Sequence, residues 1–298
     1  MAQKQTKHDG FWETLKTIFW ALLIAMVFRS TLYQPFSIPS GSMKPTLLIG
    51  DYLFVSKFAY GYSHYSLPFA PGWFEGRIWA EMPERGDVVV FKRPGKDACT
   101  QGPVAMVIGL VRAFTGGRRG APDDCVDYVK RVVGLPGDRI QVEGGILHIN
   151  GTALPTVRDG DFIEPKVRRG SPPSAPRCIN EPVAAGGDCA KEHWLETLPT
   201  KRPGGRVHSV LNLNGIVGDT SAPRYSGADN TSEFTVPAGY LFFMGDNRDN
   251  SVDSRFSQVG MVPFENLIGR AEVIALSADG AFWQFWNWRG DRFFKSIE

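Results

Sequence analysis

Residues 127–151 read DYVKRVVGLPGDRIQVEGGILHING, and this stretch decides the fold class. Three short runs in it, rich in valine and isoleucine, are Tyr128–Val133, Arg139–Val142 and Ile146–Ile149. The turn-forming sequences between them are Pro136-Gly137-Asp138 and Glu143-Gly144-Gly145. Short β-branched runs joined by glycine-containing turns predict antiparallel strands that follow one another in hairpins.

The same alternation of apolar runs and turns continues on both sides of this stretch. Further runs with strand character are Asp51–Val55, Asp87–Phe91, Glu233–Val236, Tyr240–Met244 and Ala271–Leu276. The chain of 298 residues contains 33 glycines and 21 prolines, and no long helical period occurs after residue 35. We therefore predict a mainly β protein with an antiparallel β-sheet core.

One apolar segment near the N-terminus predicts a transmembrane anchor. Residues 18–28 carry no charge, and extension to residues 16–33 approaches the roughly 20 residues that a spanning helix needs. Lysines precede or begin this segment, whereas Arg29 is the charge near its end. The positive-inside rule then places residues 1–15 in the cytoplasm and the rest of the chain outside.

Two other interpretations of this segment compete with an anchor. A cleavable signal peptide has a similar shape, but Arg29, Tyr33 and Pro35 occupy the region where cleavage would be expected. An amphipathic core helix would carry a polar stripe, which the stretch from Ile18 to Phe28 lacks. We therefore expect an uncleaved anchor that spans the membrane once.

The composition divides the remaining chain into a core and two insertions. We expect residues 34–152 and 236–298 to form the β core, with residues 97–126 inserted into it. Residues 153–235 contain nine prolines and nine glycines. A segment of that length is expected to form an inserted, loop-rich β subdomain rather than a plain linker.

Charge and histidine content exclude several classes of function. The chain carries 33 Lys and Arg against 31 Asp and Glu, whereas a dedicated nucleic-acid-binding protein usually has a clear basic excess. The five histidines show no metal-ligand spacing, and no phosphate-binding or dinucleotide-binding loop occurs. We expect no metal, no cofactor and no nucleic-acid partner.

The four cysteines do not form a C-x-x-C pair, which argues against a zinc ribbon or a thioredoxin-like site. Outside the cytoplasm they could form two disulfides, and local pairing is the simplest of three connectivities. That pairing joins Cys99 to Cys125 and Cys178 to Cys189. Free, buried thiols are the alternative interpretation.

Three segments are candidates for chemistry: Pro39–Leu47 (PSGSMKPTL), Asp127–Asp138 and Gly245–Arg255 (GDNRDNSVDSR). In a strand, Lys130 shares a face with one aromatic and one β-branched neighbour. It is then either a solvated edge charge or a desolvated amine that can act as a base near neutral pH.

The other two segments also allow an ordinary interpretation. Ser42 follows a glycine and becomes a nucleophile only if a base takes its proton, and otherwise it belongs to a surface turn. The segment Gly245–Arg255 can be a loop with Asx turns and local charge pairs, and it does not fit an EF-hand. No G-x-S-x-G elbow surrounds any serine.

Taken together, the three segments and the anchor resemble those of bacterial type I signal peptidase. The matching motifs are P-S-G-S-M-x-P-T-L, Y-V-K-R-x-x-G-L-P-G-D and G-D-N-R-D-N-S-x-D-S-R. The resemblance implies a serine endopeptidase with a Ser/Lys dyad. By that resemblance Ser42 matches the nucleophile and Lys130 the general base. Ser40 matches a hydroxyl that completes an oxyanion hole with the Ser42 N–H.

The resemblance implies supporting and substrate-binding residues as well. Ser251 matches a serine that orients the lysine amine, and Asp253 with Arg255 matches a supporting charge pair. The residues that match the walls of small apolar pockets for the substrate side chains at −1 and −3 are Phe36, Ile38, Met43, Tyr128 and Val129.

The same resemblance implies the partners and the location. The substrates would be exported preproteins, whose signal peptides are removed at small-x-small sites without a cofactor. The enzyme would be a monomer in the bacterial inner (plasma) membrane, with its N-terminus cytoplasmic and its catalytic domain on the periplasmic side. Some family members carry two anchoring helices, whereas this chain has room for one.

Two other functions and one surface property are also considered. A self-cleaving repressor-type protease shares the Ser/Lys chemistry, but residues 1–30 are too short and too apolar for a DNA-binding domain. A membrane-anchored binding module would require all three motifs to be coincidence. Two aromatic clusters, Phe58–Trp79 and Phe282–Trp288, either touch the bilayer or pack in the core.

Overall fold

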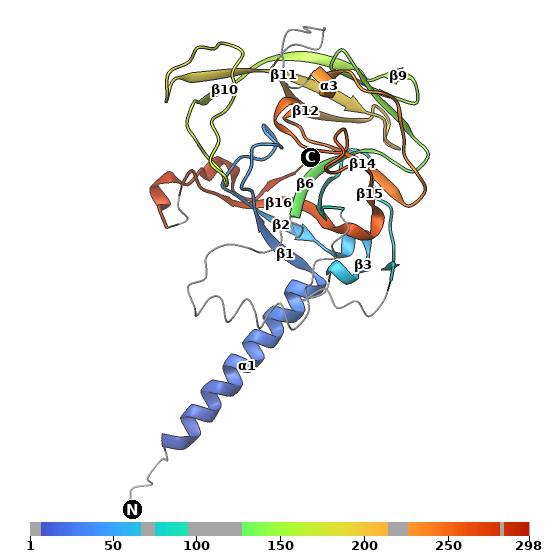
Figure 1. Cartoon of the computed structure of the whole chain (residues 1–298). Coiled ribbons are helices and arrows are strands. Elements are labelled where there is room, and N and C mark those ends of the chain that lie inside the picture. The colour runs from blue at the N-terminus through green and yellow to red at the C-terminus, as the bar shows by residue number, and fades with distance from the viewer. Residues whose placement is uncertain (1–6, 67–74, 95–126, 214–225, 281–282, 298) are drawn as a thin grey trace, which may run out of the picture.

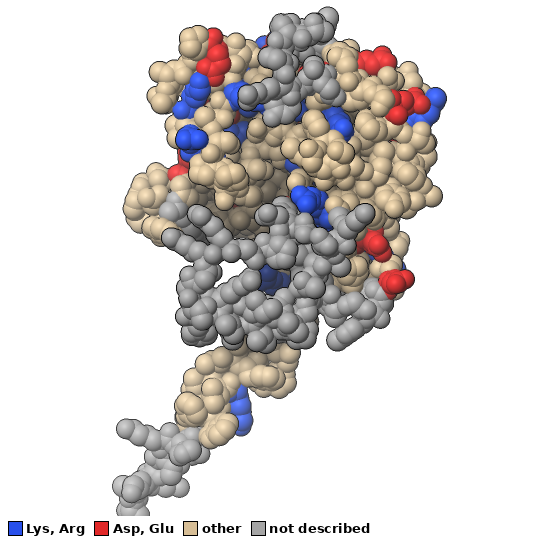
Figure 2. Space-filling view, viewed as in Figure 1, with Lys and Arg blue, Asp and Glu red and all other residues tan. Residues whose placement is uncertain are grey.

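A computed structural model describes residues 7–66, 75–94, 127–213, 226–280 and 283–297 of the chain. One long helix, α1 (Lys7–Thr31), projects from a body of β-strands (Figure 1). From Gly10 to Thr31 this helix is long and apolar enough to cross a membrane, and its most apolar stretch is not buried within the protein. Figure 2 shows that almost all of the described surface of α1 on this face is uncharged.

The helix begins and ends earlier than the expected anchor at residues 16–33. It starts at Lys7, and it stops at Thr31 because Tyr33 already pairs with Ser56 in the sheet. Pro35 also disfavours a longer helix, since proline lacks an amide hydrogen and restricts the residue before it.

The main sheet has eight antiparallel strands in the order β1-β2-β16-β5-β6-β14-β15, with β17 paired to β16. The strands are β1 (Tyr33–Ser37), β2 (Asp51–Ser56), β5 (Val88–Lys92), β6 (Asp127–Gly134), β14 (Tyr240–Met244), β15 (Val262–Pro263), β16 (Leu267–Ser277) and β17 (Lys295–Ser296). This confirms the predicted mainly β fold behind one N-terminal apolar helix.

Three smaller antiparallel sheets complete the described structure. One has the order β13-β7-β8-β9, another is β3-β4, and the third is β10-β11-β12. Their strands are β3 (Tyr62–Ser63), β4 (Arg77–Ile78), β7 (Arg139–Glu143), β8 (Ile146–Ile149), β9 (Thr152–Ala153), β10 (Thr156–Pro165), β11 (Asp188–Leu198), β12 (Arg206–Asn212) and β13 (Phe234–Thr235). A one-turn helix, α3 (Ser226–Asp229), precedes β13.

The β10-β11-β12 sheet lies within the expected insertion at residues 153–235, at the end of the body opposite α1 (Figure 1). A disulfide between Cys178 and Cys189 ties the segment before β11 to that strand. The other expected disulfide, Cys99 with Cys125, lies outside the described residues.

Successive side chains of β6 point to opposite faces of the sheet and join two different apolar clusters. Val132 and the half-buried Tyr128 pack with Phe243 on one face, while Val129 packs against a cluster around Val90 on the other. Fully burying one such side chain stabilises a fold by about 1.5–3 kcal/mol. Lys130 therefore shares its face of β6 with Tyr128 and Val132.

The described aromatic side chains of the two predicted clusters divide: Tyr60 is buried in the core, whereas several others are exposed. Trp79 is 81% exposed, Trp283 76% and Trp286 66%, so these three are not core residues. Phe282 lies outside the described residues.

Candidate active site

Ser42 follows β1 in a loop that the segment after β14 fixes in place. The Asn247 amide donates to the Ser42 carbonyl at 3.0 Å, and the Asn247 side-chain amide donates to the Gly41 carbonyl at 2.8 Å. Ser42 is only 8% exposed. Two distant parts of the sequence therefore define the position of this serine.

Lys130 lies in the middle of β6, between β5 and β14, and is 3% exposed. Its amine donates a hydrogen bond to the Ser42 hydroxyl, with 2.6 Å between Nζ and Oγ. The ring centroid of Tyr128 lies 5.6 Å from the same amine. Of the two interpretations of Lys130, the structure shows the desolvated amine in contact with a serine.

The surroundings of Lys130 favour its neutral form. Burial lowers the pKa of Lys130 from 10.5 to about 8, even though the nearby carboxylates of Asp253 and Asp246 act to raise it. Arg255 adds a smaller effect that lowers this pKa further. About one tenth of the amine is therefore unprotonated at pH 7, against about one in three thousand for an ordinary lysine, and this fraction can accept a proton.

Gly245 allows the loop after β14 to approach the serine closely. A Cβ atom at this position would lie 2.6 Å from the Ser42 carbonyl oxygen and still closer to the Ser251 hydroxyl. Both contacts are shorter than real Cβ atoms make. A side chain at position 245 would therefore push Ser42 and Ser251 apart.

Asp253 and Arg255 form a fully buried ion pair in this loop. The guanidinium donates to the carboxylate at 2.9 and 3.0 Å, and the Gly245 amide donates to the same carboxylate at 2.9 Å. Burial alone would raise the pKa of Asp253, but the charge of Arg255 and these hydrogen bonds lower it. Within the pair, Asp253 supplies the negative charge that acts on Lys130, and Arg255 partly offsets it.

A second buried ion pair joins β6 to the loop after β14. Arg131 donates to both oxygens of Asp246 at 2.8 Å, and the Thr46 hydroxyl donates to Asp246 at 2.5 Å. This arrangement ties β6, the loop after β14 and the loop that carries Ser42 to one another. Breaking such a pair costs about 3–5 kcal/mol because it leaves a buried charge unpaired.

The structure brings Ser40 and Ser251 to the site without all the expected contacts. The Ser40 hydroxyl lies 3.4 Å from the Ser42 hydroxyl. Ser251 is buried beside Gly245, but no hydrogen bond joins it to Lys130 within the described part of the chain. The orienting role of Ser251 remains a prediction.

Four of the five expected pocket residues come together. Ile38 and Met43 are buried in one apolar cluster, and the half-buried Phe36 and Val129 pack against it. Tyr128 packs against a different cluster, next to the amine of Lys130. The half-buried members, Phe36 and Val129, keep part of their surface open to solvent.

Sequence reasoning missed two kinds of residue around the site. Arg131 and Asp246 lie inside the recognised motifs, so their motif positions could have marked them. Glu196 on β11 accepts two hydrogen bonds from Arg248. Arg177, which directly precedes the disulfide-bonded Cys178, donates to the Asp249 carbonyl. These contacts come from the insertion, where no motif marked them. No described group of three or more His, Cys, Asp or Glu side chains is placed to hold a metal.

Comparisons with known proteins agree with this geometry. A family model described as signal peptidase, peptidase S26, matches residues 11–276. Signal peptidase I of Rickettsia typhi is 37% identical over 265 residues, which cover 88% of this chain and 79% of that protein. Signal peptidase I of Rickettsia canadensis is 36% identical over 270 residues, which cover 90% and 81%.

Among solved structures, a signal peptidase I from Enterococcus faecalis V583 matches 64% of this chain and 97% of that one, at 18% identity and a TM-score of 0.25. That score is too low to add to the assignment, which rests on the family model and the Rickettsia relatives. The chain belongs to the signal peptidase family, peptidase S26, and is a serine protease.

Proposed function

We propose that this protein removes signal peptides from exported preproteins through a dyad of Ser42 and Lys130. The observation that carries the proposal is the 2.6 Å hydrogen bond from the buried Lys130 amine to the Ser42 hydroxyl. A hydroxyl is a weak nucleophile until a base takes its proton, and a desolvated lysine is a suitable base near neutral pH.

The proposed reaction has two halves. Neutral Lys130 takes the Ser42 proton while Oγ bonds to the carbonyl carbon before the scissile bond, and the carbonyl becomes an oxyanion. The Ser42 N–H and the Ser40 hydroxyl stabilise that oxyanion, and donors of this kind contribute a few kcal/mol. The lysine then gives its proton to the leaving amine, and an ester on Ser42 remains. Lys130 activates a water that hydrolyses the ester.

Substrate selection is proposed to depend on the apolar cluster beside the dyad. Phe36, Ile38, Met43, Val129 and Tyr128 would line small pockets for the side chains at −1 and −3. Small pockets exclude large side chains because overfilling them costs about 1–3 kcal/mol or more. Small-x-small cleavage sites fit such pockets.

The proposed location is the bacterial inner membrane, with α1 as the single anchor. Arg29 near the end of α1 and the lysines before it favour a cytoplasmic N-terminus. The body would then face the periplasm, with residues 34–152 and 236–298 as catalytic core and residues 153–235 as its insertion. We propose a monomer, because all the side chains assigned to the reaction belong to one chain.

The proposal is tested with alanine variants of the dyad. Ser42→Ala and Lys130→Ala should each abolish cleavage of a preprotein, and Lys130→Arg should fail as well because guanidinium keeps its proton. The matched controls are Ser232→Ala and Lys201→Ala, two exposed positions outside the site. Cleavage by either dyad variant at more than about one hundredth of the wild-type rate would contradict the assignment, since general base catalysis contributes at least 100-fold.

A further inference from the structure

A small pocket lies next to the dyad, on the side of the inserted sheet. Its wall includes Gly41 and Asn250, which directly precede Ser42 and Ser251 in the chain, and its volume is about 20 Å³. Pro176 and Lys191 of β11 also line the pocket. A volume of this size holds a water molecule or a small polar group.

Two buried lysine side chains help to line the pocket. Lys44 and Lys191 both line it, and they are 7% and 2% exposed. The Lys44 amine is paired with Glu164 of β10, and Arg169 at the pocket edge is paired with Asp279. Lys191 has neither a hydrogen bond nor an ion pair with any residue that the structure describes. Nearby Glu164 and Asp249 act on it only electrostatically, so this amine is open to a direct partner.

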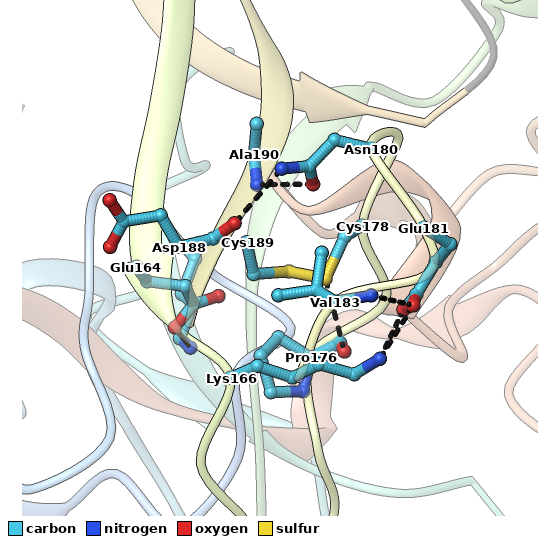
Figure 3. Close-up of a disulfide and its surroundings, with 11 residues drawn as sticks. Glu164, Lys166, Pro176, Cys178, Asn180, Glu181, Val183, Asp188, Cys189 and Ala190 are labelled. Carbon is cyan, nitrogen blue, oxygen red and sulfur yellow. Dashed lines mark hydrogen bonds and ion pairs between the residues drawn. A yellow bond between two sulfur atoms is a disulfide. The ribbon is translucent and has the colours of Figure 1, made fainter. Parts of the chain in front are cut away.

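The fold holds Lys191 in this position. Cys189 and Lys191 are two residues apart on β11, so they share the inward face of that strand. The disulfide joins Cys189 to Cys178, and the Pro176 carbonyl lies close to the Cys178 sulfur (Figure 3). The cross-link thus fixes the loop wall of the pocket against the strand that carries the amine.

The pocket connects Gly41, next to Ser42, with Lys191 of the β10-β11-β12 sheet. Strand β1 leads from α1 toward Ser42 and contributes Phe36 to the proposed binding of the signal-peptide side. The β10-β11-β12 sheet lies at the end of the body opposite α1 (Figure 1). A substrate that reaches Ser42 from the membrane therefore passes beyond it toward this sheet, with the residues that follow the scissile bond.

We infer that this cationic pocket binds a carboxylate side chain of the substrate, carried by one of the first three residues after the scissile bond. The inference rests on the proposed function. An extended chain advances about 3.3 Å per residue, so the first three residues after the scissile bond cover about 10 Å beyond Ser42. A carboxylate would give Lys191 the charged partner that it lacks, and such hydrogen bonds are stronger than neutral ones.

The test uses peptides that share one signal-peptide segment and carry Glu, Gln or Lys in turn at +1, +2 and +3. The full-length enzyme in detergent micelles should cleave the Glu peptide with a kcat/KM at least about fivefold above that of the Gln peptide at one of these positions, which corresponds to about 1 kcal/mol. The Lys peptide should be cleaved no better than the Gln peptide.

Substitution of the amine should remove this preference. In Lys191→Met the ratio of kcat/KM between the Glu and Gln peptides should fall to about one, whatever the absolute rate of the variant. The matched control is Lys201→Met, an exposed lysine of the same insertion, which should keep the wild-type ratio. The ratio compares two substrates of one enzyme, so partial loss of folded protein does not affect it.

A pH series gives a second measurement that needs no variant. Burial lowers the pKa of Lys191 from 10.5 to about 8, with Glu164 opposing the shift. Lys44 and Arg177 lower it further, and Asp249 raises it. The Glu preference should therefore decline between pH 7 and pH 9.5. Changes at the dyad affect both peptides equally and cancel in the ratio.

The outcomes separate the inference from the proposed function. A ratio near one at all three positions in the wild type would mean that the pocket holds only water, and the inference would be wrong while the protease assignment stands. A preference that survives in Lys191→Met would also overturn it. If no peptide is cleaved at all, the proposed function fails and the inference fails with it.

Discussion

Glu196 on β11 accepts two hydrogen bonds from the guanidinium of Arg248, at 2.6 and 3.0 Å, and both side chains are buried. Arg248 belongs to the short 3-10 turn that precedes Ser251. Its carbonyl accepts a hydrogen bond from Arg255 at 2.7 Å. The inserted sheet is thereby connected to the charge pair that faces the dyad lysine.

His208 on β12 lies beside this pair without competing for it. Its Nε2 atom is 3.4 Å from Glu196, so a protonated imidazole would add a second cation to the carboxylate. Burial and the neighbouring Arg131 hold the pKa of His208 well below its ordinary value of 6.5. His208 is therefore neutral at neutral pH, and Arg248 is the charged partner of Glu196.

Replacement of Glu196 tests whether the inserted sheet positions the catalytic loop. Glu196→Gln removes the charge but keeps the shape, and it leaves Arg248 buried without a counter-charge. We expect kcat to fall at least about tenfold while KM changes little, because the dyad is disturbed but the pocket walls are not. Steady-state kinetics on a peptide substrate measures both constants.

The matched control for this substitution is Glu192→Gln on the same strand. Glu192 pairs with Arg158, whose side chain is well exposed, and exposed pairs contribute only about 0–1 kcal/mol. The control should retain wild-type kcat. Equal kinetics in Glu196→Gln and Glu192→Gln would show that the Arg248 contact does not position the loop.

The activity should depend on pH through Lys130. Only the neutral amine can accept the Ser42 proton, and the pKa of Lys130 is about 8. We expect kcat/KM to rise about tenfold per pH unit below pH 8 and to level off above it. A rate profile from pH 6 to pH 9.5 measures this dependence. A flat profile over that range would rule out lysine as the base.

The same burial should make Lys130 costly for stability. The pKa is lowered from 10.5 to about 8, so the unfolded state binds the proton more readily. At pH 7 Lys130→Met should therefore be more stable than the wild type by as much as about 3 kcal/mol. This advantage should shrink as the pH rises from 8 to 10.5, where the amine is neutral in the folded state and half neutral in the unfolded state.

Denaturant titration of the detergent-solubilised chain at pH 7 and pH 10.5 measures that difference. Lys201→Met, at an exposed position, should change the stability by the same small amount at both pH values. If the advantage of Lys130→Met is the same at pH 7 and pH 10.5, it arises from packing alone and not from the buried amine.

Enlarging the apolar cluster should loosen the choice of cleavage site. Ile38 is 4% exposed and packs with Met43, so Ile38→Ala opens space next to the dyad. We expect larger side chains to be accepted at −1 or −3 and some cleavage to move to other positions. Mass spectrometry of the products from one preprotein detects both effects. Unchanged products and unchanged rates across a −1 series would remove Ile38 from the pocket.

The exposed aromatic side chains should bring the body into contact with lipid. Trp283 and Trp286 lie on the surface, where indole rings favour the membrane interface. Protein that lacks residues 1–31 should co-sediment with lipid vesicles, and Trp283→Ser with Trp286→Ser should reduce the bound fraction severalfold. Trp194→Phe, at a half-buried position on β11, is the control. Failure of the unaltered truncated protein to sediment would disprove the contact.

The sequence predicted those strands in which the residue propensities and the apolar pattern can be read within the strand and its flanking turns. The turn at Gly137 and the β-branched runs around it appear where we expected them, since local propensity and the apolar pattern agree there. β10 and β11 were not predicted individually, because β10 is exposed along most of its length and has no clean apolar alternation. Their pairing depends on partners distant in the sequence.

For the candidate site as well, residues within recognisable motifs were predicted and residues of the insertion were not. The motif resemblance was sufficient to pair Ser42 with Lys130, although 88 residues separate them. It could not indicate that Glu196 and Lys191 approach the site, because single charged residues in a strand carry no spacing signal. Only the fold of the insertion brings these side chains beside the catalytic loop.

The passage from α1 into β1 has a kinetic consequence. Leu32 alone separates the two elements, so the height of Ser42 above the end of the helix is fixed. In the proposed topology, a preprotein whose own helix lies in the same bilayer as α1 would meet the serine at that height. Its search is then two-dimensional, and confinement to a plane acts as a high effective concentration. Turnover should therefore follow the surface density of the enzyme and the preprotein in the membrane rather than their bulk concentrations.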